Sequence, residues 1–574
     1  SSVIVKGEGL GTEKTKGIDF ALNAEARDVI LKDLKYLWPK GMAEVPRDWV
    51  TRNIKMGKVP YVDLNLKGRL VDVFHDVKMH LDQLEGKIDI ANVSVDYLKG
   101  MPSATGVFGQ ALYDQKNFRI QVNKGECHGQ KIVKGNILIT KMDEVDQDIS
   151  IDLNIEGSVK SALELIDFDP LHYAREMKLK SDTAHGYAKT HLKLDFPLET
   201  TVTLKEVKVD IKSNLERVRL EAPIQILPVQ ISAGDFLIVV DQNRLLFKGD
   251  ALLNQSKAHI TWQRNFLASE SLKNKLEVTS DFDAKLWAFL GLEKIGTVEG
   301  ISPLHLVYDD FSNTANLQLK MNTNNMYMRI FGTSKEKGSP GHVEIDARFK
   351  QDQLAEIKKF DCVAGDAISI QGSAEFTPGQ VLPNKINVNS FKLGKTKIKP
   401  KFKLKKNKTY RLTIEGGILD LESILDQLQN ETDAQDFKES FDADVKLDEL
   451  YVLGERPLKK VEFNTSMVGG MVRKLNMRGY FATTQMPRAL FVVVNSPKNG
   501  ERVLEVTTNH FGELMQSLGL SDRLLRGRLV IKASHDNKPK SPWIGRFKIY
   551  DFNLKDPPVL GKLLSLAFPT DFMD

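Results

Sequence analysis

The chain has 574 residues, of which 41% are hydrophobic and 27% are charged, and its formal net charge at pH 7 is +5. This composition is typical of folded proteins and excludes wholesale disorder. The mild positive charge comes without the interleaved aromatic and basic residues of an RNA-binding surface, so we expect no nucleic-acid partner. The two cysteines, Cys127 and Cys362, fit neither a metal-ligand spacing nor a disulfide framework.

Apolar and polar residues alternate with a period of two along most of the chain. Val62–Leu66 and Ile149–Ile155 show the pattern clearly, and Ile368–Ile370, Leu412–Ile414 and Phe547–Ile549 repeat it further along. Because successive side chains of a strand point to opposite faces, each run gives one apolar face and one polar face. The runs are short and recur about every ten residues, which favours antiparallel meanders over βαβ units. We therefore predict a mainly β chain.

Short helical segments interrupt the strands, and we place the boundaries of four β segments near them. The length allows either several compact domains or one elongated architecture whose units contact only their neighbours. The predicted segments are 1–156, 157–290, 291–416 and 417–574. Their helices are expected near residues 24–54 (two helices, the first from Ala24 to Leu37), 159–177, 282–290, 418–428, 511–525 and 557–567.

Motifs that carry catalysis or bind metal are weak in this sequence. Gly7–Thr15 resembles a phosphate-binding loop, but Glu13 stands where that motif needs glycine, so we interpret the segment as a turn. His185 and His191 share strand parity, but no third residue completes a recognisable zinc arrangement. Neither a nucleophile elbow nor a zinc-protease helix motif is present. We therefore predict a protein that is not an enzyme and that uses no metal and no cofactor.

A run of alternating lysines stands out near residue 400. Ile398, Phe402 and Leu404 occupy the alternate positions, so the lysines share one strand face. One interpretation is a solvated face that discourages edge-to-edge aggregation. The other is contact with anionic lipid head groups, to which each nearby lysine could contribute about 1 kcal/mol. The lysines concerned are Lys395, Lys397, Lys399, Lys401, Lys403 and Lys405.

Several stretches carry a family resemblance. Leu37-Trp38-Pro39 is followed by Pro46–Val50, and Val95–Gly109 contains a tyrosine and a Gly-Met-Pro turn before its strand. His191–Phe266 and the late helical segment Pro557–Ala567 follow in the same order. Together these residues resemble the AsmA-like family of bacterial envelope proteins, specifically its YhdP branch.

The resemblance implies an elongated, twisted antiparallel β-sheet folded into an open hydrophobic groove, with a few short helices that cap or plug it. It also implies a bridge-like conduit that moves phospholipids across the periplasm between the inner and outer membranes, with envelope proteins as partners at its ends. The family carries an N-terminal membrane anchor. We therefore expect a periplasmic protein tethered to the inner membrane by an anchor outside this sequence.

In such a conduit the acyl chains would contact apolar residues at alternate strand positions, although each of these residues could instead belong to an ordinary closed core. The predicted lining residues are Leu64, Leu66, Ile88, Ile90, Ile151, Leu153, Leu192, Leu194, Val207, Val209, Leu317, Leu319, Ile345, Ile370, Val388, Ile414, Val445, Leu447, Val506 and Ile549.

Two other classes of protein could in principle explain the alternation. A structural or interaction protein of the envelope, whose sheets close into sandwiches, would show the same alternation, because its apolar faces bury one another. A β-solenoid enzyme that acts on polysaccharide would show near-identical coils and clustered acids or aromatics, which this sequence does not have. Alternation alone therefore leaves the conduit and the sandwich protein open.

Overall fold

The computed structural model describes residues 2–12, 17–38, 44–73, 76–144, 146–177, 179–198, 202, 206–220, 230–267, 271–380, 382–405, 409–422, 440–468, 471–481, 488–495, 501–536, 541–553 and 555. Among these residues, 31 strands belong to one sheet and three short strands to another. The mainly β chain with a long, mostly antiparallel sheet, which the sequence predicted, is confirmed. The chain separates into two compact units, Ser1–Val278 and Thr279–Asp574, which are described in turn. The finer division into four segments stays a prediction.

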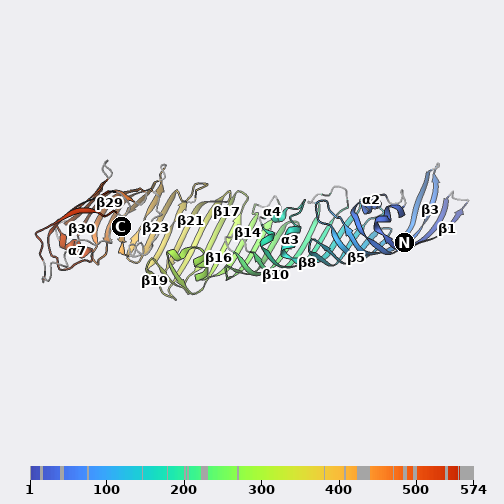
Figure 1. Ribbon diagram of the computed structural model, residues 1–574, viewed down its shortest axis with the longest axis horizontal. Helices are drawn as coiled ribbons and strands as arrows, with labels where there is room; N and C mark the ends of the chain where they lie inside the picture. The colour runs from blue at the N-terminus through green and yellow to red at the C-terminus, as the bar shows by residue number, and fades with distance from the viewer. Residues whose placement is uncertain are drawn as a thin grey trace. The chain divides into compact units, whose positions relative to one another are not determined.

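In the first unit, each strand pairs with the next one along the chain from β1 to β13, always antiparallel. Figure 1 shows these strands side by side in chain order. The strands are β1 (Ser2–Thr12), β2 (Gly17–Ile30), β3 (Ile54–Val73), β4 (Asp76–Val95), β5 (Ala104–Asp114), β6 (Asn117–Cys127), β7 (Gln130–Thr140), β8 (Asp148–Ser158), β9 (Ala184–Pro197), β10 (Lys208–Leu220), β11 (Ile231–Val240), β12 (Arg244–Leu253), β13 (Ser256–Asn265) and β14 (Asn274–Phe282), in which the division falls.

The helices of the first unit are short. The helix predicted from Ala24 is wrong in its first part, because Ala24 pairs with Val5 of β1 and Leu64 of β3 and so lies inside a strand. The period of two in β2 therefore prevails over the helical spacing. The described helices are η1 (Leu31–Asp33), α1 (Leu34–Leu37), α2 (Glu44–Asn53), α3 (Val159–Leu165), α4 (Tyr173–Glu176) and η2 (Ser181–Thr183).

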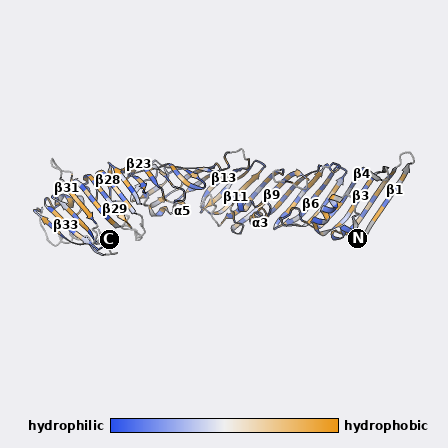
Figure 2. Ribbon diagram, turned by 90° about the horizontal axis from the view of Figure 1, so that it is seen from above, coloured by the Kyte–Doolittle hydropathy of each residue, from blue (hydrophilic) through white to orange (hydrophobic). Residues whose placement is uncertain are grey.

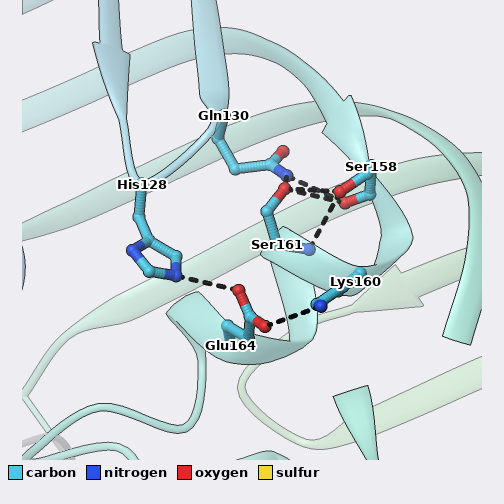
Figure 3. A network of polar contacts seen from close by, with 6 residues as sticks. All are labelled: His128, Gln130, Ser158, Lys160, Ser161 and Glu164. Carbon is cyan, nitrogen blue, oxygen red and sulfur yellow. Dashed lines mark hydrogen bonds and ion pairs between the residues drawn. The ribbon is translucent and has the colours of Figure 1, made fainter. Parts of the chain in front are cut away.

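A polar network fastens α3 to the sheet, and Figure 3 shows it from close by. Ser158 caps the helix by accepting a hydrogen bond from Ser161 N at 3.0 Å. Gln130 Nε2 donates to Ser161 Oγ at 2.6 Å and to Ser158 O at 2.9 Å. His128 Nε2 lies 3.0 Å from Glu164 Oε2. Because His128 and Gln130 belong to the tight hairpin between β6 and β7, the helix is held where it packs against β8 and β9.

In the second unit the antiparallel order runs from β16 to β34, interrupted by two parallel pairs, β26 with β28 and β27 with β28. Three short strands, β15, β18 and β19, form the small separate sheet. The strands are β15 (Gly296–Glu299), β16 (Ser302–Asp310), β17 (Thr314–Asn322), β18 (Tyr327–Ile330), β19 (Thr333–Lys335), β20 (Gly341–Lys350), β21 (Gln353–Ala364), β22 (Ile368–Glu375), β23 (Lys385–Leu393), β24 (Thr396–Ile398), β25 (Lys401–Leu404), β26 (Thr409–Glu415), β27 (Ile418–Asp420), β28 (Ser440–Tyr451), β29 (Leu458–Val468), β30 (Met471–Phe481), β31 (Arg488–Asn495), β32 (Arg502–Thr508), β33 (Arg528–His535) and β34 (Ile544–Tyr550).

Two helices of the second unit cover parts of its sheet. In α5 (Ala284–Phe289), the buried Trp287 donates from Nε1 to Gly296 O at 2.9 Å and joins a core cluster with Met321 and Ile368. In α7 (Phe511–Ser517), Phe511 and Leu514 belong to a second buried cluster. The unit also has a 3₁₀ turn, η3 (Leu292–Lys294).

Two of the predicted helices are not found among the described residues. The helix expected near 418–428 begins as strand β27, and its residues from 423 onward lie outside the described part of the chain. The helix expected near 557–567 lies entirely outside the described residues. Within the described part of the chain, none of the helices combines the length and the apolar character needed to cross a membrane.

Candidate functional site

One face of the first unit's sheet carries an unbroken line of apolar residues across β3 to β10. Residues that pair across neighbouring strands point to the same side of a sheet, so the pairing register shows which side chains share a face. The members of this line, called the apolar row below, are in order of pairing Val62, Ile88, Ala111, Ile120, Ile137, Ile151, Leu194 and Val209.

The residues one position away form an equally continuous polar line on the opposite face. This polar row consists of Asp89, Gln110, Gln121, Asn136, Asp152, Lys193 and Asp210. Figure 2 shows the alternation as orange and blue bands along strands such as β6 and β9. In each of the seven strands from β4 to β10, the residue in the apolar row is apolar and its neighbour in the polar row is polar.

The apolar row is only half covered. Ala111 is 1% exposed, whereas the larger members of the row are half-buried. Large aliphatic side chains inside a closed core are usually buried completely. Half-burial indicates that neighbouring side chains shield them from the side, while no second layer covers them among the described residues. The face therefore offers a strip of accessible hydrocarbon surface.

A second line runs beside the apolar row on the same face. It contains Ile90, Gly109, Val122, Gly135, Leu153, Leu192 and Ile211, which pair in this order. The predicted lining residues of β3 lie on this face too, since Leu64 and Leu66 are two and four positions from Val62. Val207, which precedes β10, is also half-buried. The structure thus brings the strand-borne lining residues predicted in the first unit onto one face.

In the second unit, the predicted residues before β23 share a face in the same way. Leu319 pairs with Ile345, and Leu317 lies two positions away on the same strand. These residues and Ile370 are half-buried, while Val388 is 8% exposed. The accessible apolar surface therefore recurs in this unit.

Near the C-terminal end of the second unit the apolar face is closed. Ile414, Val445 and Leu447 are at most 5% exposed and form a cluster with Phe511 and Leu514 of α7. Val506 and Ile549 pack against the same cluster and are half-buried. The first three residues therefore belong to a closed core in this structure, because α7 covers them.

The predicted lysines face away from the apolar side. Five of the six are exposed, and Lys405 is half-buried with its Nζ 2.6 Å from Asp442 Oδ2. The run is interrupted between β24 and β25 at Lys399 and Pro400. Phe402, between the lysines of β25, pairs with Ile386 and Leu412 on the other side of the sheet. Contact between these lysines and anionic head groups stays a prediction, and it would take place on the polar surface.

An open depression of about 500 Å³ lies beside the first of these lysines. Lys392, Lys395 and Lys397 contribute to its wall together with Tyr451, whose ring centroid is 5.3 Å from Lys395 Nζ. Asp366 also lines it, so the charge of the depression is mixed.

Histidines on the polar face pair with carboxylates. His191 Nε2 lies 2.8 Å from Asp152 Oδ1, a member of the polar row, and His259 Nδ1 lies 2.8 Å from Asp250 Oδ1. Each is a two-residue contact between neighbouring strands. Within the described residues, no three His, Cys, Asp or Glu side chains come together in a group that could hold a metal ion.

The comparison with family models decides the family. The model described as YhdP protein matches residues 9–477, well over half of the chain. The chain belongs to the YhdP family. Both lines of the apolar face lie inside the matched part of this YhdP-family chain, whereas α7 lies beyond it. No curated protein and no solved structure matches the chain.

Some members of the apolar row were missed in the sequence. Ile120 lies in the clear alternation of Phe118–Val122 and could have been found, whereas Leu138 beside Ile137 blurs the alternation of β7. Ala111 is small and carries little hydrophobic signal by itself. The register with their neighbours, which single strands cannot reveal, places all three in the row.

Proposed function

We propose that this YhdP-family chain is a bridge-like conduit for phospholipids between the inner and outer membranes, with the acyl chains held along the apolar face. The observation that carries the proposal is the half-buried apolar row backed by an unbroken polar row. An acyl chain could lie along the first, while the second keeps the opposite face in water. Membership of the YhdP family supports an envelope location, which we propose to be the periplasm.

The energetics explain why an extended face suits this function. A phospholipid that crosses water exposes about 30 methylene groups, at about 0.8 kcal/mol each, so the cost of exposure is about 24 kcal/mol. A passive carrier lowers that cost only if the hydrocarbon stays covered along the whole path. A row of side chains repeated on every strand provides such cover without any bond chemistry, so we propose a transport protein and not an enzyme.

Phospholipid bound to the purified chain tests this proposal. We expect organic extraction followed by mass spectrometry to recover phospholipid from the unmodified protein. Leu194→Asp places a charge in the apolar row and should reduce the recovered phospholipid severalfold. Lys193→Asp places the same group one position away, on the polar face, and should leave the amount unchanged.

The outcomes separate the conduit from the sandwich protein. A preparation free of phospholipid would favour closed sandwiches with a structural or interaction role. An equal loss in both variants would mean that the position of the charge on the sheet is irrelevant, and this would contradict the proposal. Thermal unfolding of both variants shows whether either has lost its fold.

A further inference from the structure

At one end of strands β30 to β33 the apolar face gives way to cationic and aromatic residues. Leu475, Val494, Leu504 and Ala533 form a line of pairs next to the cluster closed by α7. Two positions beyond this line on their strands stand Arg473, Arg502 and His535. Arg502 pairs directly with His535. Because side chains alternate with a period of two, Arg502 and His535 lie on the apolar side of the sheet. Arg473 stands at a bulge of β30 and is close enough for its charge to act on Arg502.

The contacts of Arg502 are unusual for a surface arginine. Its Cζ lies 5.2 Å from the ring centroid of Trp543, and the His535 ring is 5.3 Å from the same indole. Arg502 Nη2 is 3.1 Å from His535 Nδ1, and since a guanidinium can only donate, Nδ1 accepts this hydrogen bond. Arg502 Nε is buried and has no hydrogen-bond partner among the described residues.

The electrostatics of this group are unbalanced. Burial lowers the pKa of Arg502, and the positive charge of Arg473 lowers it further. On the opposite face of the same strands, Lys532 Nζ has a carboxylate partner, Glu505 Oε1, at 2.7 Å. A partly buried cation with a free donor is costly unless an anion compensates it. An arginine fork is well suited to the planar, paired oxygens of a phosphate.

We propose that Arg502 and Arg473 form a binding site for a phosphate group, oriented so that an attached acyl chain extends over Leu504 toward the apolar face. The inference rests on the proposed function for the acyl part of the ligand. The phosphate could come from a phospholipid head group or from free phosphate, and both present the same anionic oxygens to the guanidinium groups. The apolar line next to the arginines favours the phospholipid, because an amphiphile satisfies both surfaces at once.

Calorimetric titration of the whole chain tests the site. The probes are dihexanoylphosphatidylglycerol below its critical micelle concentration, sodium phosphate, and uncharged dihexanoylglycerol. We expect the phospholipid to bind most tightly and Arg502→Gln to weaken its binding about tenfold, as expected when a hydrogen bond to a charged group is lost. Arg473→Gln should weaken it in the same direction, which keeps the test informative if Arg502→Gln fails to fold.

Arg478→Gln is the matched control. Arg478 also lies over aromatic rings, with Cζ 4.9 Å from the Tyr480 centroid and 5.8 Å from that of Phe491, but it is exposed on the polar face. Arg478→Gln should therefore leave phospholipid binding unchanged. Phospholipid binding that is equal in folded Arg502→Gln and the unmodified chain would overturn the site.

Two further outcomes locate any failure. Sodium phosphate that binds as tightly as the phospholipid would overturn the acyl part of the proposal and assign the site to free phosphate. If Arg502→Gln changes nothing while Leu194→Asp still loses phospholipid, the phosphate site is wrong and the proposed conduit survives. The two proposals are thus tested by residues in different units.

Discussion

Leu153 occupies the space directly above Gly135 on the apolar face. The two residues pair across β7 and β8, and a β-carbon added at Gly135 would lie 2.2 Å from Leu153 Cδ2 and 2.9 Å from Asp152 O. We therefore expect Gly135→Ala to lower the free energy of unfolding of the first unit by about 1–3 kcal/mol through overpacking. Urea unfolding measures the change.

The same relationship predicts a coupling. Leu153→Ala removes the nearer clash, so the cost of Gly135→Ala should be smaller in the Leu153→Ala background, and a double-mutant cycle should give a non-zero interaction energy. The backbone oxygen of Asp152 stays close, so the relief should be partial. Strictly additive effects would show that Leu153 does not lie over Gly135.

The degree of burial predicts a difference between two lining leucines. Leu447 is 3% exposed under α7, whereas Leu153 is half-buried. Leu447→Ala should therefore lower the free energy of unfolding by about 2–5 kcal/mol, as in closed cores. Leu153→Ala should lower the free energy of unfolding by about 1 kcal/mol, because it removes less buried apolar surface. Equal costs in urea unfolding would contradict the contrast between an open and a closed face.

Much of this contrast could not be predicted from the sequence. The alternation in Ile149–Ile155 predicts β8 correctly because a period of two is a local property of the strand. Burial of Leu447 depends on Phe511 and Leu514, which are distant in sequence and reach it only in the folded chain. The row shared by Ile151 and Leu194 likewise depends on register. The connection from β8 to β9 runs through α3 and α4, so the single strands do not reveal this register.

The burial of Arg502 could not be predicted from the sequence either. An arginine between a glutamate and a valine gives no sign in sequence of its burial or of its contact with Trp543. Conversely, the strong helical spacing of Val29, Ile30 and Leu34 is misleading, because Val29 and Ile30 complete the ladder between β2 and β3. Pairing with β3 outweighs the local helical preference of these two residues.

The ion pair of Lys405 predicts a pH effect. Its hydrogen bond to Asp442 holds the pKa of that carboxyl below its usual range, with a further contribution from Arg411. A folded-state pKa below the unfolded value gives stability that is complete above the unfolded pKa, about 3.9, and is lost as the pH falls through the folded pKa. Lys405→Gln should raise the pKa of Asp442 in a carboxyl NMR titration. Lys403 is an exposed neighbour, so Lys403→Gln is the control and should leave the pKa of Asp442 unchanged.

The reactivity of the Cys362 thiol measures how well this position of the apolar face is shielded from water. Cys362 pairs with Val343 and Ile370 on this face, and burial raises its pKa to about 11. At pH 8 only about one thousandth of the thiol would be ionised, and the thiolate is the reactive form. In a Cys127→Ala background, alkylation by iodoacetamide should be about two orders of magnitude slower than for an ordinary thiol. A rate like that of a free thiol would mean that water reaches this position.

Photo-crosslinking at four consecutive positions of β8 tests the central claim most directly. A benzophenone side chain is placed in turn at Ile151, Asp152, Leu153 and Asn154, and the chain is irradiated in cells and analysed for attached phospholipid. Attachment at positions 151 and 153, and its absence at 152 and 154, is the result that a lipid-bearing apolar face predicts. Attachment at none of the four, or equally at all of them, would contradict it.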